Sequence, residues 1–272
     1  MNYKWILSLL LLPGVLLGED DTVAAGSPRP QPVFIPAPPI VSEFIAIYDA
    51  EYNGDHLGEA VLSLSYDGRT YFMQYRMKAK RGFAALVGSK LHEQGQFKIV
   101  DGNFRPQSFS HRSKAFLSKK KWDAQFDWAT QQVTGENEGD DYELALQDEL
   151  IDPLTAFIDS DLRLIQGQSE WTQATLVKGE RREYHYRAQP PAPITTACGE
   201  FSAKPLQRSR DESPAVQETW HAQAVMPVPV RIRKTQRDGD VLDLQLSHLQ
   251  LAGQRYCGDA EALADGAEWL ED

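Results

Sequence analysis

Six histidines supply the side chains best suited to acid–base chemistry near neutral pH, because imidazole titrates in that range. They are scattered along the 272-residue chain, at His56, His92, His111, His185, His221 and His248. They show no metal-ligand spacing, and the chain contains no GxSxG, P-loop, GxGxxG or HExxH motif. The sequence therefore predicts no metal site and no cofactor, and a protein that is not an enzyme.

Two charged stretches carry groups that could bind ions or polymers. The acidic stretch from Glu136 to Asp141 has carboxylates of the kind that hold calcium, but it lacks the spaced ligands of a calcium loop. A solvated hairpin tip fits it better. The basic run Lys119-Lys120-Lys121, with Arg112 and Lys114 nearby, could meet an anionic envelope polymer or a lipid headgroup. We favour the simpler interpretation of a charged turn and edge strand that resists aggregation.

Aromatic residues recur at alternating positions in two parts of the chain. They include Tyr48, Tyr52, Tyr71, Tyr75, Trp122, Phe126 and Trp128. Such stripes can line a groove for sugars or acyl chains, and they are also typical of core and cross-strand pairs. Both interpretations stay open. If a groove exists, its candidate ligand-facing residues are Tyr48, Tyr52, Trp122 and Trp128.

The elements that must position these residues are mainly strands. Apolar and polar residues alternate over 44–52, 60–66 and 71–77, which predicts a three-stranded meander with a tight turn at Asp67-Gly68. Further strands are expected at 83–92, 96–100, 107–113, 122–128, 170–178, 183–188, 218–224, 230–234 and 241–251. A turn at Gln94-Gly95 would separate the first two of these, and a bulge near Ser247-His248 would correct the facing of the last.

One stretch has the spacing of a helix instead. Apolar residues recur at intervals of three and four between Asp152 and Ile165, Asp152 can cap the N-terminus, and Pro153 suits the first helical position. The helix should end before Gly167. A long run of strands with one helix between its halves predicts a mainly β fold. We expect a single strongly curved antiparallel sheet, or a partly open barrel, with the short helix packed on or in its concave side.

The first 25 residues have the composition of a secretory signal peptide. Lys4 precedes an apolar run from Trp5 to Leu17, and cleavage could follow Gly18 or Ala24-Ala25. The run is shorter than the roughly 20 apolar residues of a transmembrane helix, so we expect no stable transmembrane segment after cleavage. An uncleaved N-terminal anchor is the alternative. The expected location is the periplasm.

The remaining chain divides by composition into three parts. Residues 26–41 hold six of the sixteen prolines, which indicates an extended linker or, alternatively, a docking peptide for a protein partner. Residues 42–258 should form a single β-rich domain, and residues 259–272 an acidic tail that is loosely helical or disordered. The formal net charge of −11 argues against nucleic acid as a partner.

Cys198 and Cys257 are the only cysteines. An even number in an exported chain usually indicates a disulfide, and neither residue has the CxxC spacing or the clustered histidine of a metal pair. Closing this loop should stabilise the fold by roughly 4 kcal/mol.

Several segments together resemble a family of exported bacterial proteins, domain of unknown function 3108. They are Phe44 to Tyr48 with Gly54 and Gly58; Trp122 to Trp128; Gln147 to Thr155, with Thr155 where the family's helix entry has Ser; Gly199 to Phe201; Arg208 to Arg210; Trp220; and Pro229 to Arg231. The resemblance covers most of residues 43–251 and implies a β-rich periplasmic protein with no established activity. Arg210, Trp220 and Arg231 match its pattern, either as site residues or as a buried ion pair and a core anchor. Cys198 stands where the family tends to have Pro.

Our leading hypothesis is a non-enzymatic periplasmic protein of the cell envelope that binds an acyl chain or a polymer in the concavity of the sheet. One alternative is a structural or assembly factor that acts through protein contacts, with residues 26–41 as its arm. Another is an envelope hydrolase of unfamiliar geometry, which would need converging carboxylates or a Ser-His pair in a cleft.

Overall fold

The computed structural model describes residues 41–80, 89–115, 118–147, 149–211 and 213–271. The predicted signal peptide and nearly all of the predicted linker lie outside these residues, as does most of the strand expected at 83–92.

Sixteen strands form one sheet within the described residues, and every pair of neighbouring strands is antiparallel. They are β1 (Phe44–Tyr52), β2 (Asp55–Tyr66), β3 (Tyr71–Ala79), β4 (Lys90–Val100), β5 (Asn103–Ala115), β6 (Ser118–Asp127), β7 (Gln132–Asn137), β8 (Asp140–Ala145), β9 (Glu170–Val177), β10 (Glu180–Ala188), β11 (Ala192–Thr196), β12 (Gly199–Arg210), β13 (Ser213–Ala222), β14 (Pro229–Thr235), β15 (Val241–Leu251) and β16 (Gln254–Cys257). The order is β8-β7-β6-β5-β4-β3-β2-β1-β15-β14-β13-β12-β10-β9, with β11 on β12 and β16 on β15.

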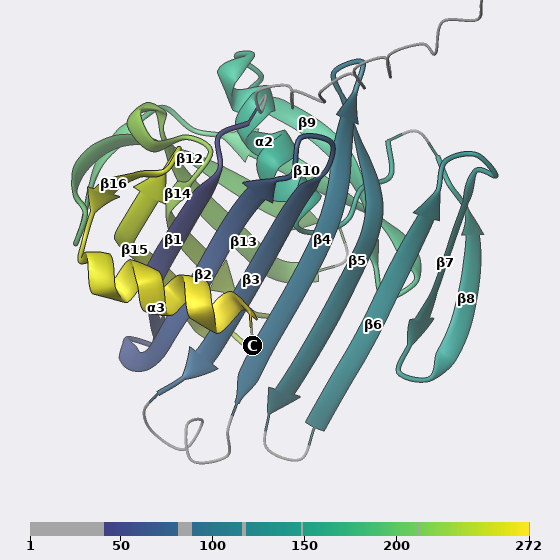
Figure 1. The fold of residues 1–272 in the computed structure, drawn as a ribbon, viewed down its shortest axis with the longest axis horizontal. Helices are drawn as coiled ribbons and strands as arrows, with labels where there is room; N and C mark the ends of the chain where they lie inside the picture. Colours follow the sequence, from purple (N-terminus) through teal and green to yellow (C-terminus); the bar gives the residue numbers. More distant parts are fainter. Residues whose placement is uncertain (1–40, 81–88, 116–117, 148, 212, 272) are drawn as a thin grey trace, which may run out of the picture. The chain divides into compact units, whose positions relative to one another are not determined.

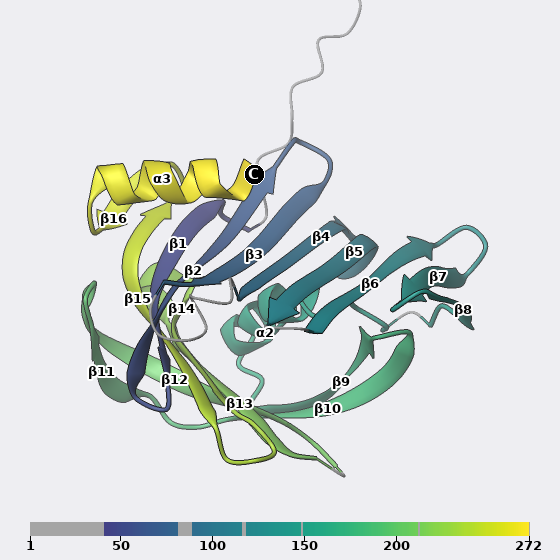
Figure 2. The same cartoon turned by 90° about the horizontal axis from the view of Figure 1, so that it is seen from below.

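The sheet is strongly curved and not closed, because its end strands β8 and β9 do not pair with each other (Figure 1). Figure 2 shows one arm of the sheet, β3 to β6, facing the other arm, β9 and β10, with helix α2 (Thr155–Ile165) between them. The predicted fold class is confirmed, including the helix on the concave side. The acidic stretch forms the β7–β8 hairpin, whose tip is Glu138-Gly139, as predicted.

The turn predicted at Gln94-Gly95 is wrong, because β4 runs through it without a break from Lys90 to Val100. Gly95 lies on the inner face directly against α2. A Cβ added there would lie 3.3 Å from Asp152 Oδ1 and 3.5 Å from Leu154 Cβ. This glycine therefore lets the start of the helix approach the sheet closely, which is a known role of glycine within a strand.

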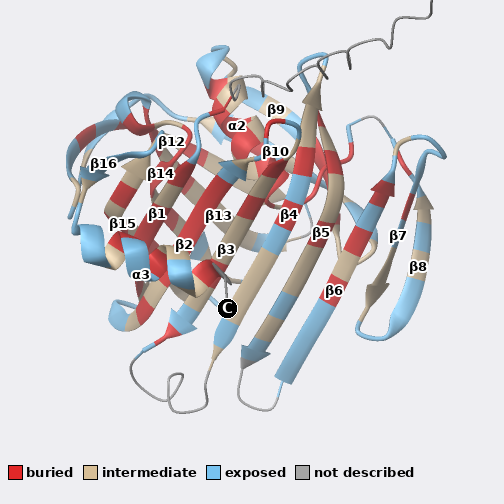
Figure 3. Ribbon diagram, in the orientation of Figure 1, coloured by how far each residue is buried: buried red, intermediate tan, exposed pale blue. Residues whose placement is uncertain are grey.

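Helix α2, most of whose residues are buried (Figure 3), begins at Thr155, two residues later than the sequence predicts, although Asp152 makes the hydrogen bonds expected of it. Asp152 Oδ1 accepts hydrogen bonds from the backbone N–H groups of Leu154 (2.9 Å) and Thr155 (3.0 Å), which is the work of an N-capping residue. Leu154 and Ile158 then point into the core, where both are buried. The helix ends at Ile165, two residues before Gly167, whose φ of 82° allows the chain to turn away.

The C-terminal residues, expected to be loosely helical or disordered, form an ordered helix, α3 (Ala260–Glu271). Leu263 and Leu270 are buried against Ile47 of β1 and Val61 of β2, on the outer face of the sheet (Figures 1 and 2). Arg76 donates a hydrogen bond to the carbonyl of Trp269 in the last turn, where a cation is favourable. The sequence alone did not reveal that β1 and β2 have an apolar outer patch for this helix to cover.

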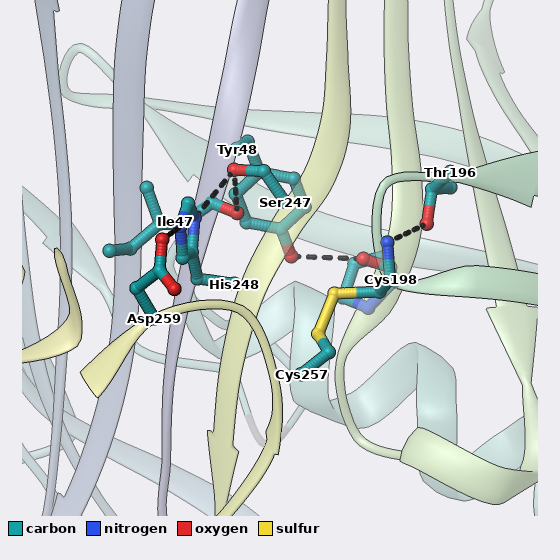
Figure 4. The surroundings of a disulfide bond; sticks show 9 residues. Ile47, Tyr48, Thr196, Cys198, Ser247, His248, Cys257 and Asp259 are labelled. Atoms are coloured by element: carbon teal, nitrogen blue, oxygen red, sulfur yellow. Dashed lines mark hydrogen bonds and ion pairs between the residues drawn. A yellow bond between two sulfur atoms is a disulfide. The ribbon is translucent and has the colours of Figure 1, made fainter.

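Cys198 and Cys257 lie at disulfide distance, with Cα atoms 5.3 Å apart (Figure 4). Cys198 immediately precedes β12, and Cys257 ends β16, a short strand that sequence reasoning missed. Cys198 N–H also donates to Thr196 Oγ1 at 3.1 Å. The link joins the β11–β12 hairpin to the β15–β16 hairpin, two neighbouring parts of the C-terminal half of the sheet.

The disulfide should be detectable both as chemistry and as stability. Unreduced, denatured protein should show no free thiol, and reduction should lower the free energy of unfolding by up to about 4 kcal/mol, because the loop becomes free in the unfolded chain. Urea unfolding with and without reductant measures the loss, and the double variant Cys198→Ser/Cys257→Ser should match the reduced protein. Two titratable thiols in the unreduced protein would contradict the pairing.

Asp152 should give the fold an unusual dependence on pH. Burial raises its pKa to about 6, although its hydrogen bonds to Thr155 and Leu154 oppose the shift. Between about pH 4 and pH 6 the unfolded chain loses this proton before the folded one, so this group makes the fold less stable as pH rises.

Asp152→Asn keeps a capping oxygen but cannot ionise. Its stability relative to the native protein should therefore rise by about 2–3 kcal/mol between about pH 4 and pH 7.5, as followed by urea unfolding. Asp67→Asn is the matched control: backbone hydrogen bonds from Thr70 and Arg69 lower the pKa of Asp67, so its pH trend should have the opposite sign. A stability difference between Asp152→Asn and the native protein that does not change with pH would show that the Asp152 carboxylate stays ionised without cost.

Candidate functional site

Two of the four aromatic candidates belong to the core. Tyr48 is fully buried on the inner face of β1, and its hydroxyl donates to the carbonyl of Pro229 at 2.9 Å. Trp122 is buried on the inner face of β6 and packs on Phe109 with ring centroids 4.5 Å apart. Neither side chain is free to meet a ligand in this structure.

The other two lie at opposite ends of the sheet. Tyr52 ends β1 and donates its hydroxyl to the carboxylate of Asp240, a contact that raises the pKa of Tyr52 to about 12. Trp128 follows β6; its indole N–H donates to the carbonyl of Pro106 at 2.6 Å, and Arg105 lies 5.3 Å from the ring centroid. The four aromatic candidates are therefore not brought together in one groove.

Two of the three family-motif residues, Trp220 and Arg231, lie on the outer face. Arg231 of β14 bonds Asp243 of β15, with Nε and Oδ1 2.8 Å apart, and its guanidinium lies 5.1 Å from the ring centroid of Trp220. The hydrogen bond to Asp243 raises the pKa of Arg231 further. Arg210 lies apart from this group, where β12 turns into β13 opposite Ser213. Trp220 and Arg231 thus form one cation–π and ion-pair cluster.

The inner face itself has two different ends. Next to α2 it is solid core, made of side chains such as Leu64, Met73, Phe97 and Phe109, all fully or almost fully buried. Toward the other end of the same strands, the register places partly exposed side chains on that face. We call this region the open end; it comprises Tyr75, Met77, Leu91, Glu93, His111, Tyr184, Arg208, Gln217, Lys234 and Leu242.

The open end combines apolar and charged groups. Glu93 Oε1 and His111 Nδ1 are 2.8 Å apart, and both side chains are 18% exposed. Lys234 projects from β14, on the far side of the concavity, and is exposed to water. Partial loss of hydration around its ammonium group nevertheless lowers the pKa of Lys234. The positive charge of Arg208 lowers this pKa further, whereas the negative charge of Glu93 opposes the shift. Glu93 of β4 and Lys234 of β14 therefore carry opposite charges on the two facing walls of the concavity.

Sequence reasoning identified the alternation of these strands but not this site. Glu93, Arg208 and Lys234 are far apart in the chain, and only the curvature of the sheet makes them face each other. The guanidinium of Arg208 lies 4.2 Å from the ring centroid of Tyr184. This cation–π contact holds the two side chains together in one wall of the open end. No local pattern in the sequence marks such pairs.

A buried chain of polar groups connects α2 with β13. Asp161 Oδ1 lies 2.5 Å from His221 Nδ1, and His221 Nε2 lies 2.6 Å from the hydroxyl of Thr219. Carboxylate, imidazole and hydroxyl follow the order used in nucleophilic catalysis. However, all three residues are buried, and the adjoining cavity has a volume of only about 10 Å³, room for one water at most.

This polar chain therefore fits the anchoring of α2 better than the turnover of a substrate. Burial raises the pKa of Asp161, and His221 partly offsets that effect. Among the described residues, no group of three or more His, Cys, Asp or Glu side chains could hold a metal ion. No helix within the same residues is long and apolar enough to cross a membrane.

Removing the histidine should loosen the helix. His221→Ala leaves a buried carboxylate without its partner, so the free energy of unfolding should fall by about 3–5 kcal/mol. Urea unfolding measures this loss. His185→Ala, at an exposed histidine in β10, should change stability by less than about 0.5 kcal/mol. Equal, small effects for both variants would show that Asp161 and His221 do not hold α2 in place.

Comparison with known proteins agrees with this fold. The crystal structure of a β-barrel-like protein of domain of unknown function DUF1849 from Brucella abortus matches with a TM-score of 0.55 and 9% sequence identity, over 78% of this chain and 98% of that chain. At this identity the likeness concerns the fold alone. No match was found among curated proteins. The family model described as "Protein of unknown function (DUF3108)" matches residues 47–246, and the chain therefore belongs to the DUF3108 family.

Proposed function

We propose that this protein is a non-enzymatic, exported protein of the periplasm that binds an amphipathic component of the cell envelope at the open end of its inner face. The observation that carries the proposal is the contrast along this face. One end is packed solid by α2, whereas the other presents charged and apolar side chains to water in a concave setting.

The composition of the open end supports an amphipathic ligand. Met77, Leu91 and Leu242 offer apolar contacts on three strands, so an acyl segment or a ring could pack there. Lys234 and Arg208 supply two cations on the facing wall, which suits an anionic headgroup. The range of ligands that we propose is narrower than the acyl chain or polymer expected from the sequence. The helix occupies the part of the concavity where a long acyl chain would otherwise extend.

The proposed location rests on the N-terminal sequence and the cysteine pair. Residues 1–25 have the composition of a signal peptide, and a disulfide persists in an oxidising compartment such as the periplasm. The Asp161–His221–Thr219 chain has no room for a substrate. A second chain of carboxylate, imidazole and hydroxyl lies at the open end, where His111 is 2.8 Å from Glu93 Oε1 and 3.2 Å from the hydroxyl of Ser113, two residues further along the same strand. We propose that this second chain orders the polar groups that meet the ligand, and hence that the protein binds without catalysis.

Blocking the open end should abolish binding. Leu91→Trp should fill it and weaken the binding of a fluorescent, short-chain, anionic lysophospholipid about tenfold or more, as measured by fluorescence titration. Gln96→Trp is the matched control, on the outer face of the same strand, and should bind like the native protein. Native mass spectra of protein purified from the periplasm should also show a bound amphiphile. Protein that is consistently empty and binds the probe equally well in both variants would refute the proposal.

A further inference from the structure

The outer face carries a groove that the proposed function does not use. It has a volume of about 760 Å³ and lies at the end of β4, β5 and β6. Its lining residues are Lys90, His92, Arg112, Ser113, Lys114, Lys119, Lys120, Lys121, Glu136, Glu138 and Gly139. The β4 residues Lys90 and His92 have the opposite parity to Gly95, which faces α2, so the cations paired with them lie on the outer face. Ser113 and Lys120 have the parity of the inner face, so the groove also reaches the ends of the strands.

The strand register stacks cations in two rows across this groove. In the first row Lys90 pairs with Lys114, and Lys114 pairs with Lys119. In the second, Arg112 stands between His92 and Lys121. Like charges directly opposite each other on neighbouring strands are destabilising. The sequence-based interpretation of a charged turn explains exposed lysines, but not their alignment in register.

Most of these charges lack a compensating acid. Lys121 has two acidic partners: its Nζ lies 3.3 Å from Glu136 Oε1 and 3.9 Å from Asp123 Oδ2. For Lys90, Arg112, Lys114 and Lys119 no ion pair exists with any residue that the structure describes. This holds although acidic residues outnumber basic ones in the chain by 39 to 28. The groove is therefore a concentrated positive region on an otherwise acidic protein.

The pKa of His92 is affected by these neighbouring charges. Its pKa is lowered to about 4, first by burial and then by the neighbouring charges of Arg76 and Arg112. The imidazole is therefore neutral at physiological pH and does not add to the repulsion. It occupies the β4 position of the second row, beside Arg112, without adding a charge of its own.

We infer that this groove binds a molecule that carries two or more phosphate groups. The backbones that carry these cations are about 5 Å apart on neighbouring strands and about 7 Å apart for residues two apart along a strand, so the long side chains can reach phosphates joined directly or through a sugar. Arg112 can hold a phosphate with two parallel hydrogen bonds, and the lysines act as point charges around it. The volume is in the range of small-molecule sites and exceeds what a single phosphate ion fills.

The charges of the lining favour a discrete ligand over a membrane surface. Glu136 and Glu138 line the groove together with the cations. These two carboxylates would repel a broad anionic surface such as a bilayer, whereas a smaller molecule can contact the cations of β4 and β5 alone. We therefore assign the site to a soluble or individually presented polyphosphate ester.

Inorganic tripolyphosphate is a suitable probe for isothermal titration calorimetry on the purified protein. The native protein should bind it, and should bind orthophosphate at least about tenfold more weakly, because a single phosphate reaches fewer cations. Lys114→Glu places an acid at the centre of the first row and should weaken tripolyphosphate binding about tenfold or more. Arg112→Glu should do the same through the second row.

Lys98→Glu is the matched control, because it makes the same charge change on the same face of β4 but outside the groove. It should leave the affinity within about twofold of the native value. Equal losses in Lys98→Glu and Lys114→Glu would overturn the site, since they would indicate attraction by net charge alone. Binding to vesicles of phosphatidylcholine and phosphatidylglycerol in equal parts, without binding to tripolyphosphate, would overturn the discrete ligand. Leu91→Trp should bind tripolyphosphate normally, so this test is independent of the proposed function.

Discussion

The rest of the structure depends on the packing of α2 against the concave face of the sheet. A curved sheet that does not close leaves its inner side chains exposed unless something fills it. Here Leu154 and Ile158 supply the apolar surface, and Gly95 allows the helix to approach β4. Asp161 and His221 then join the far side of the helix to β13 through a buried hydrogen bond. One short helix therefore contacts both arms of the sheet.

The length of this helix decides where a ligand can bind. Because α2 has only eleven residues, it fills one end of the concavity and leaves the other to side chains of the strands. Those side chains include Glu93 and Lys234, which would be costly to bury without water or a partner. The charged groups therefore mark the part of the inner face that the fold leaves solvated. The fold and the candidate site have the same physical origin.

Much of this architecture could be predicted from sequence, because alternation and helical spacing are local signals. The strands β1 to β3, the cap of α2 by Asp152 and the bulge near Ser247 all follow from neighbours in the chain. Gly95 was misread because a glycine that opens a turn and one that admits a helix look alike in sequence. The contact of Asp161 with His221, and the position of Glu93 across the concavity from Lys234, bring together residues far apart in the chain. Their positions follow from the curvature of the sheet, which no local pattern specifies.

The alternation of a strand also explains how two unrelated sites can share β4. Leu91 and Glu93 face the open end, whereas Lys90 and His92, their immediate neighbours in sequence, face the basic groove. The two sites therefore use different side chains of β4, and they approach each other on β5, where Ser113 of the groove lies 3.2 Å from His111 of the open end. An anion that neutralises Lys90 and Lys114 would relieve the repulsion between β4 and β5, and these same strands carry Glu93 and His111 on the inner face. Firmer pairing of β4 with β5 would hold one wall of the open end in place, so occupancy of the groove and order at the open end should rise together.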